Sequence, residues 1–283
     1  MKKFVLYFVV VLFLCSCNNY GQLKLVADLP KKLKEVSGTE YSNSDNVIWM
    51  LNDSGNKPQL FAISTKGKTE KVLEIQAKNN DWEDLTSDEE GNLYIADFGN
   101  NANARQNLVI LKVNKQELSK KNVEVEKIHF SYPDQTKFPP KKKKCFFDAE
   151  SIFFKDGYLY IFTKSRVKKH YGKTSLYKIP AKEGNYEAKL VGEFNNCDDM
   201  ECWVTSAAIS PDKEKVVLLT HEAVLLFTEF DGDNFFNGTL TELPFQHISQ
   251  KEGVSFKDNN TLYITDERSH GKGGNLYEFS LKW

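Results

Sequence analysis

The stretch that decides the fold reads Trp82-Glu83-Asp84-Leu85, followed after a turn by Leu93-Tyr94-Ile95-Ala96-Asp97. An acidic pair leads into one apolar strand, and a second apolar strand ends on a carboxylate. The same phrase recurs along the chain at intervals of about fifty residues, which is the period of a repeat architecture. Each copy is therefore expected to be one unit of structure whose core is completed by its neighbours.

Four further copies of the phrase can be found in the sequence. Their first and second strands begin at Glu35 and Val47, at Asp148 and Leu159, at Val204 and Val216, and at Glu252 and Leu262. A third strand follows each copy, at 60–63, 108–113, 176–179, 224–230 and 276–279, and the first four copies have a fourth at 71–76, 123–132, 188–194 and 239–245. A strand over Leu23–Leu29, ahead of the first copy, has the pattern needed to complete the fifth.

These elements predict an all-β protein: a single β-propeller of five four-stranded blades, closed by the N-terminal strand. Closure removes the exposed edge strands that an open array would carry. The segment 135–147, which contains Pro139-Pro140 and the run Lys141–Lys144, lengthens the interval before the third copy. We interpret it as a basic loop, with a sixth, degenerate blade as the alternative.

The first residues predict export and lipidation. Met1-Lys2-Lys3 precedes an apolar run from Phe4 to Leu14, which is typical of a secretory signal and too short to span a membrane. The run ends in Leu14-Cys15-Ser16-Cys17, which resembles the lipobox of bacterial lipoproteins. The resemblance implies a signal peptide over 1–16, a lipidated (palmitate-bearing) Cys17 and a tether over 17–22, after which the repeat places the propeller domain over 23–283. Cleavage that leaves Cys17 as a plain thiol is the alternative.

Lipidation would hold the protein in the cell envelope, on the periplasmic side of a membrane or at the cell surface. Disulfides can form there, and Cys197 and Cys202 bracket a short acidic turn, so they are the predicted pair. The net charge is −1 and the basic residues are scattered, so nucleic acid is not an expected partner. We expect a monomer whose partners are the membrane, through Cys17, and a small-molecule or peptide ligand.

The recurrent acidic residues are predicted to meet at one mouth of the propeller channel, because the first strand of each blade begins where the second ends. The candidate metal ligands are Glu35, Asp53, Glu83, Asp97, Glu150, Glu252 and Asp266. Lys164, Arg105, Arg166 and Arg268 follow second strands and could offset part of that charge. Repulsion among crowded carboxylates is relieved by protonation, by lysine or arginine, or by a bound metal, and oxygen ligands favour Ca²⁺ as the cofactor. For each single residue, the alternative is a structural cap on a strand end.

Several phrases resemble those of exported bacterial propellers of the SdiA-regulated and phytase-like esterase groups. They are 52–55, 80–84, 95–101, 132–134 and 148–150, which cover the first half of the chain. The resemblance implies five or six blades, with calcium in some members. A looser similarity to calcium-dependent gluconolactonase propellers is not matched residue by residue.

Two functions are compatible with these patterns. The first is a membrane-anchored extracytoplasmic propeller that binds a cation and a small or peptide-like ligand at its acidic mouth. The alternative is a calcium-dependent hydrolase of phosphoesters or lactones, in which metal-bound water attacks and Glu83, Asp84 or Glu150 serves as the base. Binding is favoured, because no acid/base partner of these carboxylates can be recognised.

Overall fold

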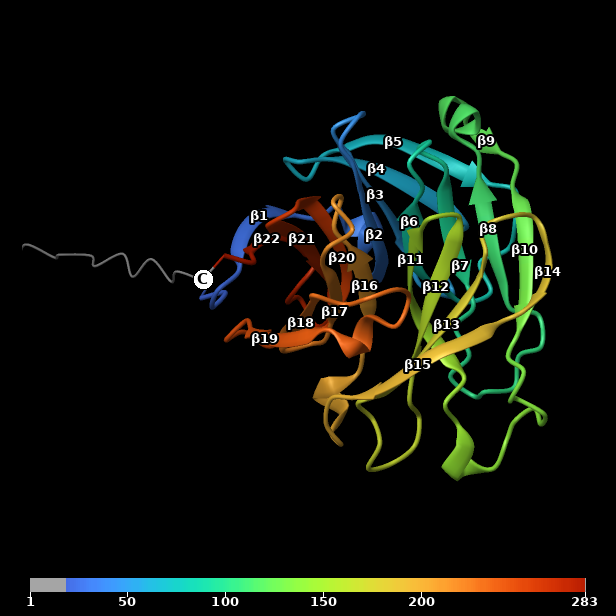
Figure 1. Cartoon of the computed structure of the whole chain (residues 1–283). Helices are drawn as coiled ribbons and strands as arrows, with labels where there is room; N and C mark the ends of the chain where they lie inside the picture. The colour runs from blue at the N-terminus through green and yellow to red at the C-terminus, as the bar shows by residue number, and fades with distance from the viewer. Residues whose placement is uncertain (1–18, 283) are drawn as a thin grey trace, which may run out of the picture.

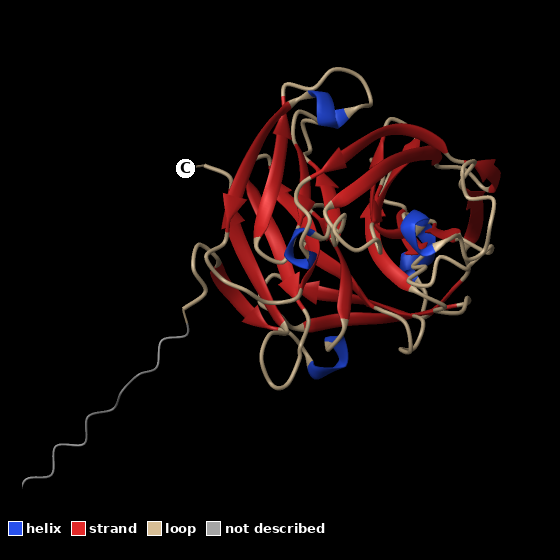
Figure 2. Cartoon of the chain, turned by 90° about the horizontal axis from the view of Figure 1, so that it is seen from below, coloured by secondary structure: helices blue, strands red, loops and turns tan. Residues whose placement is uncertain are grey.

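A computed structural model of the chain describes residues 19–282. The predicted signal peptide over 1–16 and the lipidated Cys17 lie outside the described residues. Within 19–282, no helix has the length and apolar character needed to cross a membrane. Strands make up nearly all of the regular structure, and the helices are short segments within loops (Figure 2).

The strands form five sheets, and each sheet is one blade. Blade 1 contains β2 (Val36–Ser42), β3 (Val47–Asn52), β4 (Gln59–Ser64) and β5 (Thr69–Ile75). Blade 2 contains β6 (Trp82–Ser87), β7 (Leu93–Asp97), β8 (Val109–Val113) and β10 (Glu126–Ser131). Blade 3 contains β11 (Asp148–Lys155), β12 (Tyr158–Lys164), β13 (Lys173–Pro180) and β15 (Lys189–Asn195). Blade 4 contains β16 (Ser206–Ile209), β17 (Val216–Leu219), β18 (Ala223–Thr228) and β19 (Thr239–Pro244).

Blade 5 closes the ring with strands from both ends of the chain. It contains β20 (Lys251–Asp258), β21 (Thr261–Asp266) and β22 (Asn275–Ser280), and its outermost strand is β1 (Lys24–Asp28). β1 pairs antiparallel with β22, with Lys24 opposite Glu278 and Asp28 opposite Asn275. The innermost strands β2, β6, β11, β16 and β20 contact one another in a closed cycle near the centre of the molecule (Figure 1). The predicted five-bladed propeller is confirmed.

Two blades carry a fifth strand that the sequence analysis did not predict. β9 (Asn122–Val123) pairs in parallel with β5 of blade 1, and β14 (Gly184–Glu187) pairs in parallel with β10 of blade 2. In each case, the chain of one blade reaches back to the outer edge of the preceding blade. The predicted strand over 123–132 is therefore divided, because Val123 packs in the core between blades 1 and 2, whereas Ile128 and Phe130 pack between blades 2 and 3.

The segment 135–147 forms a loop with one short helix and no sixth blade. The short 3-10 helices of the described chain are η1 (Lys31–Leu33), η2 (Lys115–Ser119), η3 (Lys142–Lys144), η4 (Met200–Cys202) and η5 (Phe235–Asn237). The insertion before blade 3 is therefore a basic loop, as the sequence suggested, and not a sixth blade.

The core is divided into five apolar layers, one between each pair of adjacent blades. Strand β3 shows why its sequence does not alternate: Trp49 and Leu51 pack towards blade 2, while Ile48 and Met50 pack towards blade 5. Because both faces of a middle strand are buried, both sets of side chains must be apolar. The unbroken apolar runs of the repeat follow from this two-sided burial.

The folded body includes part of the predicted tether. The ring of Tyr20 makes edge contacts with His247 and Tyr277, at centroid distances of 5.5 and 5.4 Å. The Gln22 backbone N–H donates to the Phe245 carbonyl oxygen at 2.7 Å. Residues 20–22 therefore already lie against blades 4 and 5, ahead of β1.

Candidate functional site

A small cavity lies at the mouth where the innermost strands begin. Its volume is about 210 Å³, and every lining residue is polar or charged: Ser37, Asp53, Glu83, Asn101, Glu150, Lys164, Arg166, Gln250, Glu252 and Glu267. These residues come from four of the five blades and from the loops that follow their strands. The lining suits an ion or a small polar molecule and offers no apolar surface to a ligand.

Three carboxylates at this mouth form a group that could hold a metal ion. One oxygen from each of Asp53, Asp81 and Glu83 lies within 4.8 Å of the other two. Asp53 follows β3, Asp81 precedes β6, and Glu83 lies on β6. No ion pair between described residues includes any of the three. We call this group the carboxylate triad.

No ion pair among the described residues neutralises the triad, and Arg105 offsets only part of the burial effect on Asp81. Burial raises the pKa of Asp53 to about 6 and raises that of Asp81. The pKa of Glu83 lies well above its usual range, first because of burial and then because Glu150 and Asp53 are near. Desolvation and like charges both favour the protonated form, and a bound cation would reverse both effects.

The blade 3 side of the mouth is already neutralised. Glu150 pairs with Lys164 at 3.0 Å and with Arg166 at 3.1 Å, and Arg166 also pairs with Asp148 at 2.5 Å. Burial acts to raise the pKa of Glu150, but the two cations outweigh it and hold that pKa below its usual value. Asp148 shows the opposite result: burial and the charge of Glu150 raise its pKa to about 7.

An aromatic side chain holds these two cations in place. The Lys164 ammonium and the Arg166 guanidinium each lie 5.0 Å from the ring centroid of Trp203. The Trp203 indole N–H donates to the Ser165 carbonyl oxygen at 2.8 Å, which fixes the ring. Cation–π contacts of this kind add to the ion pairs.

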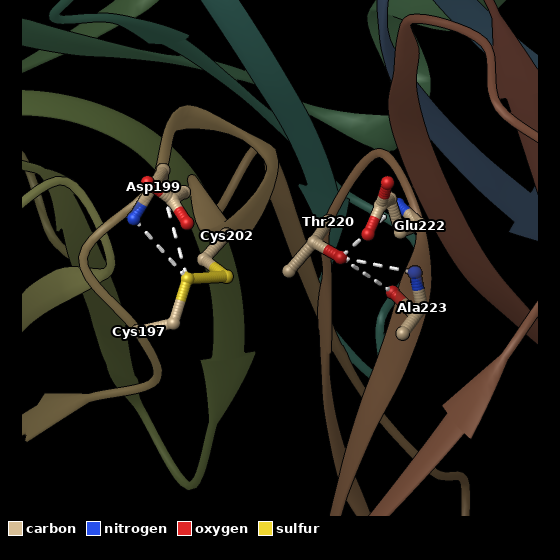
Figure 3. The surroundings of a disulfide bond; sticks show 6 residues. All are labelled: Cys197, Asp199, Cys202, Thr220, Glu222 and Ala223. Carbon is tan, nitrogen blue, oxygen red and sulfur yellow. Dashed lines mark hydrogen bonds between the residues drawn. A yellow bond between two sulfur atoms is a disulfide. The ribbon is translucent and has the colours of Figure 1, made fainter.

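The loop that ends at Trp203 is closed by a disulfide. Cys197 and Cys202 are bonded, with Cα atoms 5.9 Å apart, and η4 ends at Cys202 (Figure 3). The Asp199 backbone N–H donates to the Cys197 sulfur at 3.3 Å. Figure 3 also shows a turn in blade 4, where the Thr220 hydroxyl donates to the Ala223 carbonyl oxygen at 3.1 Å. Cys145 is a free thiol.

Blade 5 contributes a second acidic pair to the mouth. Burial, followed by the charges of Glu252 and Asp53, raises the pKa of Glu267 to about 8. The Glu252 carboxylate oxygen Oε1 lies 3.3 Å from Nε2 of the His221 ring, within hydrogen-bonding distance. The acidic surface therefore extends from the carboxylate triad across to blade 5.

Four of the seven predicted metal ligands line the cavity: Asp53, Glu83, Glu150 and Glu252. Glu35 does not line it; its carboxylate accepts from the Asn56 amide at 2.6 Å and pairs with Lys34 at 3.2 Å. Of the predicted counter-charges, Lys164 and Arg166 line the mouth, whereas Arg268 pairs with Asp28 at 2.5 Å.

The other two predicted ligands, Asp97 and Asp266, are bound within their own blades. Asp97 accepts from the Asp81 backbone N–H at 3.1 Å and pairs with Arg105 at 2.9 Å. Asp266 accepts from the Asn275 backbone N–H at 2.8 Å and from the Tyr277 hydroxyl at 2.9 Å. Both end second strands and have the strand-end role given as the alternative, so we leave them out of the proposed ligand set.

Asp84, a candidate base, lies deeper in the channel and does not line the cavity. Its carboxylate accepts from the Ile152 backbone N–H and the Ser206 hydroxyl, each at 3.1 Å, and from the Leu85 backbone N–H at 2.8 Å. Burial raises the pKa of Asp84, and these three donors oppose that rise. These hydrogen bonds connect blades 2, 3 and 4 at the Asp84 carboxylate.

Two mouth residues were not among the predicted ligands, Asp81 and Glu267. Asp81 lies in a bend just before β6, and β6 bulges between Trp82 and Asp84, so strand alternation does not place Asp81 beside Glu83. The signal for Asp81 is its place in the acidic stretch 81–84. Glu267 lies beside the predicted Asp266, and only the register of the strand end decides which of the two faces the mouth.

Comparison with known proteins finds only distant structural similarities. No protein-family model matches the chain, and no curated protein matches it. A virginiamycin B lyase from Staphylococcus aureus, solved with quinupristin, is similar with a TM-score of 0.42 and 12% identity over 89% of this chain and 68% of that one. A chain of a nidogen/laminin complex has a TM-score of 0.48 and 12% identity over 87% of this chain and 80% of that one. A streptogramin B lyase has a TM-score of 0.41 and 14% identity over 92% of this chain and 73% of that one. With TM-scores below 0.5 and identities of 12–14%, these similarities carry no argument about this chain.

Proposed function

We propose that this chain is a membrane-anchored extracytoplasmic propeller that binds Ca²⁺ and a small polar or peptide-like ligand at its acidic mouth. The observation that supports the proposal is the carboxylate triad of Asp53, Asp81 and Glu83, whose oxygens converge without a cation from the described chain. The resemblance of the first half of the chain to SdiA-regulated and phytase-like esterase propellers is part of the same proposal.

The chemistry of the triad favours a hard cation. Three carboxylates supply the charge and several of the six to eight oxygen ligands that Ca²⁺ takes, and water can supply others. The side-chain amide of Asn101 lines the same cavity and offers another oxygen. No cysteine lines the cavity, and no histidine does, so zinc is disfavoured.

The ligand would bind between this ion and the blade 3 side of the mouth. Arg166 retains partial exposure, with 23% of its side chain accessible, while Lys164 is buried. A carboxylate or phosphate of a ligand could therefore contact the ion on one side and the Arg166 guanidinium on the other. The volume of about 210 Å³ limits the part of the ligand that enters the mouth to a small polar group.

A calcium-dependent hydrolase is the second candidate, and one observation favours it. Glu83 belongs to the triad, and in the calcium-free chain its pKa is raised well above the usual value, so a carboxylate that can hold a proton lies beside the proposed ion. The other two candidate bases fit less well, because Glu150 is paired with two cations and Asp84 already accepts three hydrogen bonds. If there is turnover, Glu83 is the base we expect.

Calcium titration of the purified chain by calorimetry, with a thermal melt beside it, tests the proposal. Saturable binding and a raised melting temperature are expected for the native chain, and both should be lost in Asp81→Asn. Glu35→Gln is the matched control, because Glu35 lies outside the cavity lining and its variant should still bind. Absence of heat and of any thermal shift in the native chain would remove the cation from the proposal.

Two further assays test the enzyme alternative and the membrane anchor separately. Hydrolysis of a generic phosphoester or lactone that requires calcium and is abolished by Glu83→Gln would select the enzyme. Incorporation of labelled palmitate that disappears in Cys17→Ser would support the membrane anchor. A native chain that takes up no label would contradict the anchor without touching the calcium site.

A further inference from the structure

A second cavity lies at the opposite mouth of the channel, where the innermost strands end. Its volume is about 370 Å³, within the range of about 300–1,000 Å³ usual for ligand sites. All five blades contribute to its lining, among them Glu40 of β2, Ser87 of β6, Phe154 of β11, Ile209 of β16 and Phe256 of β20. It is therefore built on rigid strand ends, and we call it the far-mouth cavity.

A hydrogen-bonded layer separates this cavity from the acidic mouth. Asp84 joins β6 to β11 and β16 through Ile152 and Ser206, and the Ser206 hydroxyl accepts from the Val254 backbone N–H of β20 at 3.2 Å. Asp84 and Ser206 line neither of the two cavities. The far-mouth cavity is thus a separate site, and its occupant does not depend on the proposed calcium site.

Glu40 places a carboxylate in this cavity with one side-chain partner. It accepts a hydrogen bond from the Ser87 hydroxyl at 2.5 Å. No ion pair between described residues includes it, because the cation of the cavity, Lys213, pairs with Glu89 at 2.8 Å and with Asp156 at 2.6 Å. Burial raises the pKa of Glu40 to about 7, and the bonds from Ser87 oppose that rise. A carboxylate in these surroundings lacks the positive group that would neutralise it.

The rest of the far-mouth cavity lining determines which kind of positively charged group can bind there. Phe154, Ile209 and Phe256 give the cavity apolar walls. A metal ion would need several oxygen ligands, but the other carboxylates are engaged: Asp88 accepts from Asn92 at 2.8 Å and from the Tyr94 hydroxyl at 2.9 Å, and Glu89 is paired with Lys213. A single half-buried carboxylate beside apolar walls complements an ammonium group on an apolar body.

We propose that the far-mouth cavity binds a small organic primary amine in its protonated form. The ammonium donates to the Glu40 carboxylate, and the hydrocarbon part packs against Phe154, Ile209 and Phe256. Neither the acidic mouth nor the membrane anchor enters this inference. The ligand class is an alkylammonium ion of small size, and a neutral molecule of the same shape lacks the group that Glu40 requires.

Calorimetric titration of the full chain with n-pentylamine hydrochloride at pH 7.5 tests the assignment, with 1-pentanol as the neutral probe of the same shape. Saturable binding of the amine is expected, at least tenfold tighter than that of the alcohol. Glu40→Gln should lose at least tenfold in amine affinity while it keeps the Ser87 partner. Asp45→Asn, in the exposed turn after β2 and outside the cavity lining, is the control and should bind as the native chain does.

The result is independent of the calcium proposal. Asp81→Asn, which removes a triad ligand, should leave amine binding unchanged, so failure at one mouth is distinguishable from failure at the other. Equal affinity for amine and alcohol, or full amine binding by folded Glu40→Gln, would overturn the inference. The comparison of the two probes on the native chain decides the question even if Glu40→Gln does not fold.

Discussion

The Ser206 hydroxyl of blade 4 donates a hydrogen bond to the Asp84 carboxylate of blade 2 across the channel, over 3.1 Å. Blade 3 lies between these two blades in the chain, and it joins the same carboxylate through the Ile152 backbone N–H. One side chain therefore fixes the relative positions of three blades at the axis. A contact of this kind stabilises the ring as a whole rather than one sheet.

Asp84→Asn should lower the free energy of unfolding by about 1–3 kcal/mol. An amide has one oxygen where three donors converge, so at least one buried donor is left without an acceptor. Urea denaturation measures the change, with Asp45→Asn in the exposed turn after β2 as the control, expected within about 0.5 kcal/mol of the native chain. An unchanged midpoint for Asp84→Asn would show that the layer does not contribute.

Arg166→Met should destabilise the fold by about 3 kcal/mol, because it leaves the buried Asp148 without its cation. Lys24→Met removes an ion pair whose lysine side chain is 77% exposed, and its effect should stay below about 1 kcal/mol. Both variants are compared in the same denaturant series. Equal losses in the two would mean that burial of the Arg166 pair adds nothing.

Stability of the calcium-free chain should fall as pH rises from about 5 to 8. Glu267 has a pKa of about 8 in the fold against an ordinary value of 4.5, so over this interval the folded chain holds a proton that the unfolded chain has released. Melting temperatures in EDTA at several pH values measure the decline. Glu267→Gln should make it shallower, and an identical slope in the variant would refute this assignment.

Loss of the Cys197–Cys202 disulfide should cost about 2 kcal/mol, since it closes a short loop. The double variant Cys197→Ser/Cys202→Ser should also shift the fluorescence of Trp203, because the loop that positions this ring is released. Cys145→Ser is the control, since Cys145 is a free thiol. A double variant with native stability and emission would show that Trp203 is positioned by its hydrogen bond to Ser165 alone.

The blades could be predicted from the sequence because a strand that is buried on both faces has an unbroken run of apolar residues. Ile48 and Met50 had to be as apolar as Trp49 and Leu51, whichever neighbour each packs against. The division of the strand over 123–132 could not be predicted, because the pairing of β9 with β5 depends on how far one blade reaches over the next. The sequence of residues 123–132 alone does not specify that pairing.

The sequence indicated an acidic mouth but not which carboxylates face it, because the innermost strands bulge there: Glu83, Glu150 and Glu252 each lie at a register shift. Asp81 and Glu83 face the mouth, while Asp84 points into the channel layer. At the end of the second strand of blade 5, Glu267 faces the mouth and Asp266 faces the blade. A shift of one position moves a side chain to the other face, and composition alone does not determine that register.

The pairing of β1 with β22 sets an order of events during synthesis. The ribosome makes β1 before, and β22 after, the other described strands of the propeller, so β1 has no partner in its own blade until β22 has been made. Until then, the growing protein is an open arc with unpaired strands at both ends. A ring that closes late is compatible with passage through a membrane in an unfolded state, as the proposed export requires, and it makes the final residues of blade 5 decisive for whether translocated chains mature or aggregate.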